Sequence, residues 1–553
     1  MAQSIADAPE TATNHKRLGN IQALLGGVHL RRIRKPALIT LGLLLGFVAV
    51  FFVYLSVSHI IGSNSDNASI ILEGQAMLHG NLLLHGWYLP PDSFITTEMA
   101  LDALGSVFFS GEQLLKITPA FLFTATVFGA AYLASRNAAG PARRRWLAVG
   151  ACVAIIAFPV GPQFYFAMQG PMHFGTIVAS LLAWLAYDHF TRHQQSWGAW
   201  GLFVLVTTLA IIGDPMAELL IVPPVGVVCA LVLWQTRFRD RAARVMLGGA
   251  ALALALGIGA RQLLIIGGTH IQTATATPAL VSVSHLWPHL QWMLLSIAQF
   301  FHIDLRLVLG FNQWLLFLLL NGAFLLVGVV GFARLFRHTL IPKDLRDSLS
   351  SVLAWAIIGT IMAFLFTDFA TNFLTIRYLL PAGVYAGILC YDAFARVVAE
   401  RYLMRFVLAF LVVSSLTFGI MLANAQRAAV PQQQLIAFLE SHHLSTGFGS
   451  YWAANITTLL SDGQVHVLPV MDTPVSGHIH VYRWHASADW FQGAQFNSAR
   501  FVVVDGSVKL APFQTAVNTT FGPPDQIYHL SGSPGYTIFV WNHPIPTAAI
   551  GLT

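Results

Sequence analysis

Charged residues are scarce in this sequence. Its 553 residues are 56% hydrophobic and only 10% charged, whereas soluble globular domains carry about a quarter charged residues. The mean hydropathy of +0.65 agrees with this bias. The composition therefore argues against a soluble multidomain enzyme and indicates a chain that lies largely in a membrane.

Cysteine is also scarce, and the N-terminus has no recognisable targeting segment. Only three cysteines occur, each inside an apolar run: Cys152, Cys229 and Cys390. They cannot form a disulfide framework or a zinc site. The first 36 residues include charged side chains but no apolar signal-peptide core or small-residue cleavage site. We expect them to form a cytoplasmic tail.

The hydrophobic residues are gathered in long runs of the length that crosses a bilayer, which is about 20 residues in a helix. Basic residues lie in short groups between alternate runs, as the positive-inside rule describes, and they do not form the single basic face of a nucleic-acid-binding protein. The N-terminus is thus expected in the cytoplasm and the C-terminus outside. Eleven spans are predicted, near 37–61, 115–135, 146–161, 172–190, 198–213, 216–235, 245–266, 312–333, 349–368, 378–395 and 406–424.

Three segments outside these spans are too long to be simple connectors. The predicted membrane domain, 37–424, contains outer loops at 62–114 and 267–311, and it is followed by a C-terminal extracytoplasmic domain at 425–553. In that domain helical and β-rich runs alternate between turn residues, which predicts a small α/β fold. The predicted helices are Gln432–His442 and Tyr451–Leu460, and the predicted strands are Val465–Val470, His478–Trp484, Phe501–Asp505 and Thr537–Trp541.

The first outer loop carries six acidic residues and no basic residue. Its stretches Ala68–His79 and Thr97–Phe109 have helical spacing and are expected along the membrane interface. Asp66 follows the first span closely, so its carboxylate can accept a proton from an acceptor hydroxyl or coordinate a divalent cation at the outer surface. The alternative is that Asp66 only caps the helix that begins near Ala68.

Two motifs resemble a known family. The stretch Ser65-Asp-Asn-Ala-Ser-Ile-Ile-Leu-Glu-Gly-Gln-Ala-Met-Leu-His-Gly-Asn81 looks like the first-loop motif of GT-C glycosyltransferases, in the bacterial subfamily related to dolichyl-phosphate-mannose protein mannosyltransferases. Arg377-Tyr-Leu-Leu-Pro381 resembles the Arg-Tyr-x-x-Pro that opens a late span in the same group. The resemblance implies a polytopic α-helical GT-C-like fold and transfer of sugar from a polyprenyl-phosphate donor.

Carried over to these positions, the resemblance makes Asp66 the catalytic or metal-linked carboxylate and Arg377 a partner of the lipid phosphate. Asn67 stands where many members have a second acidic residue, so a cofactor of Mg²⁺ or Mn²⁺ and a metal-free general base both remain open. Arg261, Arg306 and Lys116 lie at similar membrane boundaries and are further candidates for binding the donor phosphate. Boundary cations also commonly extend to lipid headgroups without a specific ligand.

Other polar residues of the outer side are candidates for the same site. Glu98 and Asp102 share a helical face at i, i+4; Glu98 is a second catalytic candidate and Asp102 a substrate contact, although such a pair is more often a solvated face. Asp214 ends a span beside Pro215 and can face a cavity or the outer interface. The remaining candidates for substrate contact, from the second outer loop, are Gln163, Tyr165 and His173.

Histidines and aromatic residues outside the first loop permit weaker interpretations. His285 and His289 have a chelating spacing, but Pro288 between them disfavours a regular helix, so no histidine metal site is expected. In the C-terminal domain, the aromatic residues of 447–452 and 482–484 suit stacking on sugars, although core packing is the commoner role of such residues.

The sequence therefore predicts an inverting glycosyltransferase of the bacterial inner membrane, which acts on the extracytoplasmic face with a glycan, lipid or protein as the acceptor. A transporter or flippase of a lipid-linked intermediate is the first alternative, although it should show repeated halves and broken helices. A non-catalytic assembly subunit is the second alternative.

Overall fold

The computed structural model describes residues 38–170, 172–193, 196–272, 279–304, 311–425, 431–472, 477–532, 535–547 and 550. The chain divides into two compact units, residues 1–53 and 54–553. In the first unit, the described residues belong to the helix Leu38–Ser58. The predicted cytoplasmic tail, 1–36, and Arg306 lie outside the described residues.

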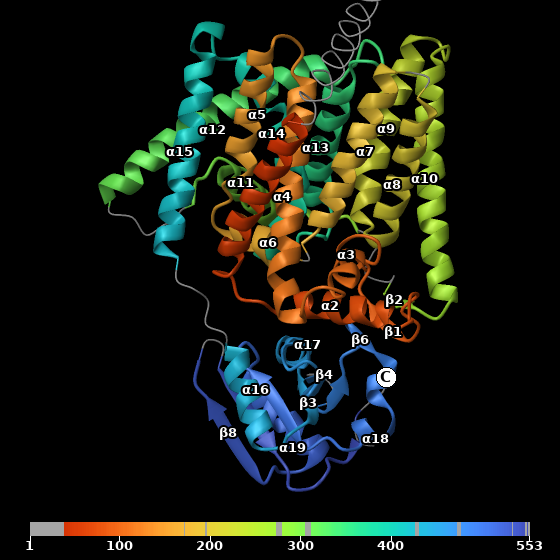
Figure 1. Ribbon diagram of the computed structural model, residues 1–553, viewed down its shortest axis with the longest axis vertical. Helices are drawn as coiled ribbons and strands as arrows, with labels where there is room; N and C mark the ends of the chain where they lie inside the picture. Colours follow the sequence, from red (N-terminus) through yellow and green to blue (C-terminus); the bar gives the residue numbers. More distant parts are fainter. Residues whose placement is uncertain are drawn as a thin grey trace, which may run out of the picture. The chain divides into compact units, whose positions relative to one another are not determined.

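The protein is an integral membrane protein built mainly from long apolar helices that lie side by side (Figure 1). Among the described residues, eight helices are long and apolar enough to cross a bilayer, rather than the eleven predicted. They are Leu38–Ser58, α4 (Gly111–Asn137), α9 (Met216–Gln235), α10 (Arg241–Ile266), α12 (Phe311–Thr339), α13 (Leu349–Phe366), Phe373–Ala395, which joins η1 (Phe373–Leu379) to α14 (Leu380–Ala395), and α15 (Glu400–Asn424).

The other three predicted spans are also helices: α5 (Ala142–Ile156), α7 (Phe174–Arg192) and α8 (Trp197–Gly213). Two of them are short, with 15 residues in α5 and 17 in α8, and α7 carries a buried Asp188 near its C-terminal end. Length and charge thus explain why these helices fall below the usual requirements for a span.

The connections that carry the predicted basic clusters meet one another. Arg136, at the end of α4, and Arg192, at the end of α7, both bind the fully buried Asp188 at 2.7 Å. Arg144, in α5, pairs with Glu400, in α15, at 3.2 Å. These alternate connections therefore lie at one end of the helices, as the charge pattern predicts.

The long outer segments also meet one another, in a small three-stranded sheet. In its centre is β1 (Trp87–Leu89) from the first loop, which pairs in parallel with β2 (His270–Ile271) and antiparallel with β6 (Ala486–Ser487) of the C-terminal domain. The first loop also forms α2 (Ser65–Leu78) and α3 (Glu98–Gly105), where the two helical stretches were predicted. The sheet joins segments that are hundreds of residues apart in the sequence.

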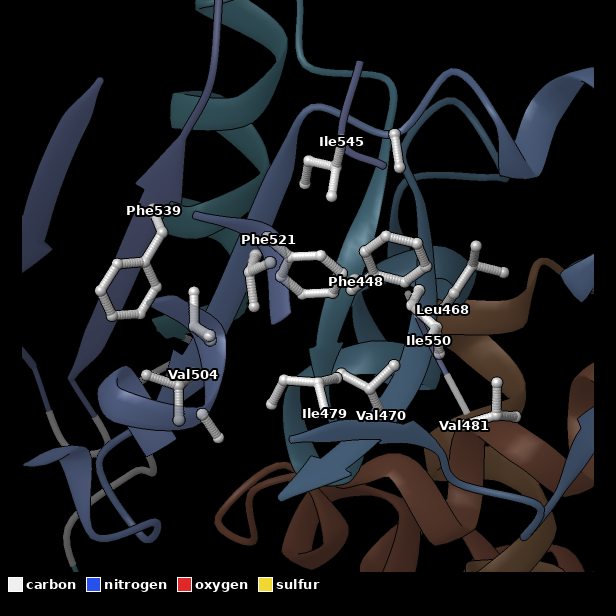
Figure 2. Close-up of a cluster of buried hydrophobic side chains, with 14 of the residues drawn as sticks. Phe448, Leu468, Val470, Ile479, Val481, Val504, Phe521, Phe539, Ile545 and Ile550 are labelled. Carbon is white, nitrogen blue, oxygen red and sulfur yellow. The ribbon is translucent and has the colours of Figure 1, made fainter. Parts of the chain in front are cut away.

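The C-terminal domain contains a mixed six-stranded sheet with the order β5-β4-β3-β7-β9-β8, in which β3 is parallel to both β4 and β7. Its core contains Phe448, Leu468 and Phe521, as Figure 2 shows. The strands are β3 (Thr446–Ser450), β4 (His466–Asp472), β5 (Ile479–Val481), β7 (Phe501–Asp505), β8 (Gln526–Leu530) and β9 (Tyr536–Val540). The helices are α16 (Pro431–Ser441), α17 (Tyr451–Leu460), η2 (Ala488–Phe491), α18 (Gly493–Phe496) and α19 (Leu510–Phe521).

One local prediction is wrong. Pro288 was expected to disfavour a regular helix there, yet α11 (Val283–Phe300) continues through it. The proline is the sixth residue of this helix, just past the four N-terminal N–H groups that have no intrahelical acceptor, so the helix continues through it at the loss of one hydrogen bond in its second turn. The rings of His285 and His289 are consequently neighbours, with centroids 6.5 Å apart.

Candidate active site

Asp66 lies in the first turn of α2, where a carboxylate is favoured by the helix dipole. It does not cap the helix, contrary to the alternative above. Asn64 is the N-cap residue, and its side chain accepts a hydrogen bond from Asn67 N at 3.2 Å. The half-buried Asp66 carboxylate instead accepts a 2.5 Å hydrogen bond from the hydroxyl of Tyr451, the first residue of α17 in the C-terminal domain.

Arg377 lies in η1, a single 3₁₀ segment that leads into α14. Its guanidinium is half-buried, lies 5.2 Å from the ring centroid of Tyr378, and is 3.9 Å from the sulfur of Met172. Its Nε is buried without a hydrogen-bond partner. In the part of the chain that the structure describes, no carboxylate oxygen lies within 4.0 Å of this guanidinium.

Arg377 is nevertheless surrounded by charge at longer range, because the carboxylates of Asp92 and Asp66 both act on it electrostatically. Tyr165, in α6 (Pro162–Gln169), is 36% exposed and is subject to the charges of both Asp66 and Arg377. Asp66, Arg377 and Tyr165 are therefore close enough to interact electrostatically, which makes them one candidate site. A half-buried arginine without an ion-pair partner is suited to binding an anionic ligand.

Beside Arg377 is a largely buried group of residues from three segments. His173, the N-cap residue of α7, donates from Nδ1 to Asp214 Oδ2 at 2.7 Å, and Thr176 donates to the same oxygen at 2.6 Å. Asp92, from the first loop, lies 3.9 Å from His173 Nε2. The Asp214 candidate thus faces inward, towards the first loop, and not the outer interface.

The protonation states of this group follow from burial and mutual attraction. Burial alone lowers the pKa of His173, but the charge of Asp214 outweighs it and the pKa is raised. Burial alone raises the pKa of Asp214, but His173 and the hydrogen bonds to this carboxylate lower it overall. The two side chains therefore form a charged pair. Burial raises the pKa of Asp92, against the opposing charge of His173.

Glu98 and Asp102 are both buried, so the alternative of a solvated face is wrong. Glu98 Oε1 accepts a hydrogen bond from Gly175 N at 2.8 Å, and Glu98 Oε2 is buried without a partner. Asp102 accepts a hydrogen bond from Thr118 of α4. Burial raises the pKa of both carboxyls, that of Asp102 to about 8. Glu98 therefore belongs with α7 and the His173 group, and its catalytic role stays a prediction.

Two other candidate phosphate ligands already have protein partners. Arg261 donates to the carbonyl oxygen of Pro91 at 2.9 Å and lies 4.0 Å from Glu218. Lys116 donates to the carbonyl oxygen of Ile61 at 2.7 Å. It also lines a pocket whose other polar lining residues are His59, Ser63, Glu112, Gln113 and Gln432. Arg377 also has neutral partners, because its Nη2 donates to the Tyr378 hydroxyl at 3.4 Å, but its Nε is buried without a hydrogen-bond partner.

The structure also shows the surroundings of Gln163 and bears on the predicted metal site. Gln163 is buried in α6 and donates to the carbonyl oxygen of Ser296 in α11 at 3.1 Å, so it joins two helices, and its predicted substrate contact stays untested. Within the described ranges, no three His, Cys, Asp or Glu side chains are grouped to hold a metal ion. Asp66 is thus not accompanied there by a protein ligand set for Mg²⁺ or Mn²⁺.

Sequence reasoning missed the partners that distant segments supply. Tyr451 lies 385 residues from Asp66 in the chain, and His485 donates from Nδ1 to Glu73 Oε1 at 2.8 Å across 412 residues. Neither tyrosine nor histidine stands in a recognisable motif. The spacing of seven residues between Asp66 and Glu73 was the available signal, because it places both on one face of α2.

Comparisons with known proteins complete the description. No family model matches the sequence, and no curated protein sequence matches it. Among solved structures, ArnT from Cupriavidus metallidurans bound to undecaprenyl phosphate is similar over 93% of this chain and 99% of its own, with 14% identity and a TM-score of 0.51. The apo state of the same protein is similar over 93% of this chain and 100% of its own, with 14% identity and a TM-score of 0.50.

An oligosaccharyltransferase from Archaeoglobus fulgidus, in complex with zinc and sulfate, covers 91% of this chain and 74% of its own at 14% identity, with a TM-score of 0.39. At these identities the ArnT likeness concerns the arrangement of the chain and not its chemistry. The protein therefore has the fold of the GT-C glycosyltransferases, with a small C-terminal sheet domain.

Proposed function

We propose that the protein is an inverting glycosyltransferase that moves a sugar from a polyprenyl-phosphate donor to a hydroxyl acceptor on the extracytoplasmic face of the bacterial inner membrane. The observation that carries the proposal is that the half-buried Arg377 has an unpartnered Nε and no carboxylate within 4.0 Å among the described residues, while Asp66 acts on it electrostatically. The GT-C fold, and the undecaprenyl phosphate bound in the ArnT structure, support a lipid phosphate as the anion.

The two residues have complementary roles in this mechanism. Asp66 accepts the proton of the acceptor hydroxyl while the hydroxyl oxygen forms a bond to the anomeric carbon of the donor sugar. The bond between that carbon and the phosphate oxygen breaks, and the polyprenyl phosphate leaves with both electrons. Arg377 stabilises the negative charge that develops on the leaving phosphate. Attack from the side opposite the phosphate inverts the anomeric configuration.

The mechanism contains no metal step, because the described residues do not gather a ligand set around Asp66. Dependence on Mg²⁺ or Mn²⁺ stays a prediction, with Asp66 as the protein ligand. It is measured by chelation with EDTA, followed by return of each metal.

The test is transfer of radiolabelled sugar from a panel of polyprenyl-phosphate sugars by the purified protein and two variants. Asp66→Asn should lower the rate by the 10² to 10⁴ fold that is typical of losing a general base. Arg377→Gln should lower it by about 10² fold, as for the loss of one group that stabilises developing charge. Full activity of Asp66→Asn would exclude Asp66 as the base, and the flippase or assembly-subunit alternatives require that variant to work normally.

The chain offers a matched control for Arg377. Arg401 also precedes a tyrosine and lies over its ring, 4.7 Å from the Tyr402 centroid, but it is exposed at the start of α15. Arg401→Gln removes the same charge and the same cation–π contact away from the site. It should leave the transfer rate unchanged, and an equal loss in both variants would indicate a general effect of charge or stability.

A further inference from the structure

The C-terminal domain contacts α2 through a regular row of polar pairs. Asp66 binds the hydroxyl of Tyr451 at 2.5 Å, Ser69 accepts from Asn455 Nδ2 at 2.6 Å, and Glu73 binds His485 at 2.8 Å. Positions 66, 69 and 73 recur every three or four residues, so they share one face of the helix. Tyr451 and Asn455 have the same spacing on α17, and the two helices therefore meet along their faces.

From this geometry we infer that the C-terminal domain completes the active site, with Tyr451 as a positioning residue that holds the Asp66 carboxylate. The inference rests on the proposed function, because it assigns Asp66 the role of base. It gives a role to a domain that the sequence leaves without one. It also explains why the domain is attached to α2 rather than only tethered to the last span.

Docking of the domain does not depend on the Tyr451 hydroxyl. The contact between α2 and α17 includes an apolar cluster in which Ile456 and Leu459 pack with Ala68 and Ile71, and apolar burial of this kind supplies most of the stability of a contact. The Ser69 and Glu73 pairs are buried. At the Asp66 end of the row, both residues are only half-buried, so this end of the contact is less enclosed than the Ser69 and Glu73 pairs.

The hydroxyl has a specific task at that position. Asp66 is close enough to act electrostatically on Arg377 but lies beyond 4.0 Å of it. A direct ion pair between Asp66 and Arg377 would leave neither the carboxylate available to the acceptor hydroxyl nor the guanidinium available to the lipid phosphate. By donating to one oxygen of Asp66, Tyr451 fixes the orientation of the carboxylate and leaves its other oxygen for the acceptor hydroxyl.

The experiment compares Tyr451→Phe with Ser69→Ala in the full chain. Tyr451→Phe removes the hydroxyl but keeps the ring, which packs against Tyr482 and Trp452 with centroids 5.3 and 5.0 Å apart. Ser69→Ala removes the hydrogen bond from Asn455 and the one to the Ser65 carbonyl oxygen, but keeps the hydroxyl of Tyr451 and its bond to Asp66. We expect Tyr451→Phe to lower kcat by about 10 to 10² fold, as for a misplaced catalytic group, with KM for the acceptor unchanged. Ser69→Ala should retain the wild-type kcat.

A double variant separates positioning from stability. If Tyr451 acts only through Asp66, Tyr451→Phe should cause no further loss in the Asp66→Asn background. Wild-type kcat in Tyr451→Phe, equal losses in Tyr451→Phe and Ser69→Ala, or additive losses in the double variant would each overturn the inference while the proposed function stands. Absence of transfer by the wild-type protein would instead overturn the proposed function, and the inference with it.

Discussion

The buried Asp102 carboxyl makes the stability of α3 depend on pH. It is 4% exposed, and burial raises its pKa from 3.8 to about 8, with an opposing effect from the Thr118 hydrogen bond. Between these two values the folded protein holds a proton that the opened segment releases. Stability from this group is therefore fully present below pH 3.8 and is lost as the pH rises towards 8.

The size of the effect follows from the shift. Each pH unit above the unfolded pKa costs about 1.36 kcal/mol, so at pH 7 the cost is about 4 kcal/mol. Asp102→Asn has nearly the shape of the neutral acid and does not ionise, and its amide oxygen can still accept from Thr118. We expect this variant to be more stable than wild type at pH 7, by up to about 4 kcal/mol, with the difference shrinking towards pH 4.

Amide hydrogen exchange of residues 98–105 at pH 5, 6, 7 and 8 measures the free energy of local opening in both proteins. Comparing Asp102→Asn with the wild type at the same pH removes the pH dependence of the intrinsic exchange rates and the contributions of the other carboxyls, because both are common to the two proteins. If Asp102→Asn opens more easily than wild type at every pH, Asp102 is ionised in the folded protein. That result would refute the reasoning from burial and favour the predicted contact with substrate.

Three further predictions concern the packing around the site. A Cβ at Gly175 would lie 2.5 Å from Glu98 Oε2, so Gly175→Ala should displace this carboxyl from the Gly175 N–H and destabilise the protein by about 1 to 3 kcal/mol, as for overpacking. Thermal unfolding measures the change in stability. The control is Gly198→Ala, because nothing lies within 4 Å of a Cβ at that position. Breaking the buried pair of Glu73 and His485 should cost about 3 to 5 kcal/mol, so His485→Ala should increase hydrogen exchange in α17, whereas His79→Ala at the exposed end of α2 should not. Burial raises the pKa of Glu73. Burial alone would lower the pKa of His485, but the charge of Glu73 outweighs it and that pKa is also raised. The folded contact therefore binds protons more tightly than the unfolded chain does, and the protection of α17 against hydrogen exchange in the wild type should fall as the pH rises from 6 to 9. Unchanged protection over that range would contradict the assignment of these shifts.

Local patterns in the sequence were enough to predict many of the elements but not their partners. The helices α2 and α17 were predicted within a few residues of their bounds, because their apolar spacing and cap residues are local signals. Strands β3 and β8 of the six-stranded sheet were missed, and so was helix α19. Strand β3 contains two glycines, at positions 447 and 449. A Cβ added at either glycine would collide with Phe501 or Val467 of the neighbouring strands. The close approach of these strands, and not β propensity, therefore decides the conformation of β3.

The candidate site shows the same division. Asp66 and Arg377 were predicted as site residues from short motifs, and in the structure Asp66 acts electrostatically on Arg377. Glu98 was predicted as a partner of Asp66 because both are acidic and lie in one loop, but it binds the backbone of Gly175 in α7. Which side chain faces which partner depends on contacts between segments hundreds of residues apart, and such contacts leave no period or motif in a single sequence.

The charge balance of the first loop connects these contacts to function. Six acidic residues with no basic neighbour in the loop would repel one another in a partly dehydrated site. The fold relieves this repulsion one residue at a time. His485 pairs with Glu73, His173 lies beside Asp92, and the buried Asp102 holds a proton at neutral pH.

Asp66 differs from these acidic residues because its partner is the neutral hydroxyl of Tyr451. This hydrogen bond orients the carboxylate without cancelling its charge. Arg377 has no carboxylate within ion-pairing distance among the described residues. One anionic and one cationic group are thus kept unneutralised and close together, while the charges around them are paired or protonated. Maintaining this pair against direct collapse costs free energy, and such a cost is expected at a catalytic site and not in a structural contact.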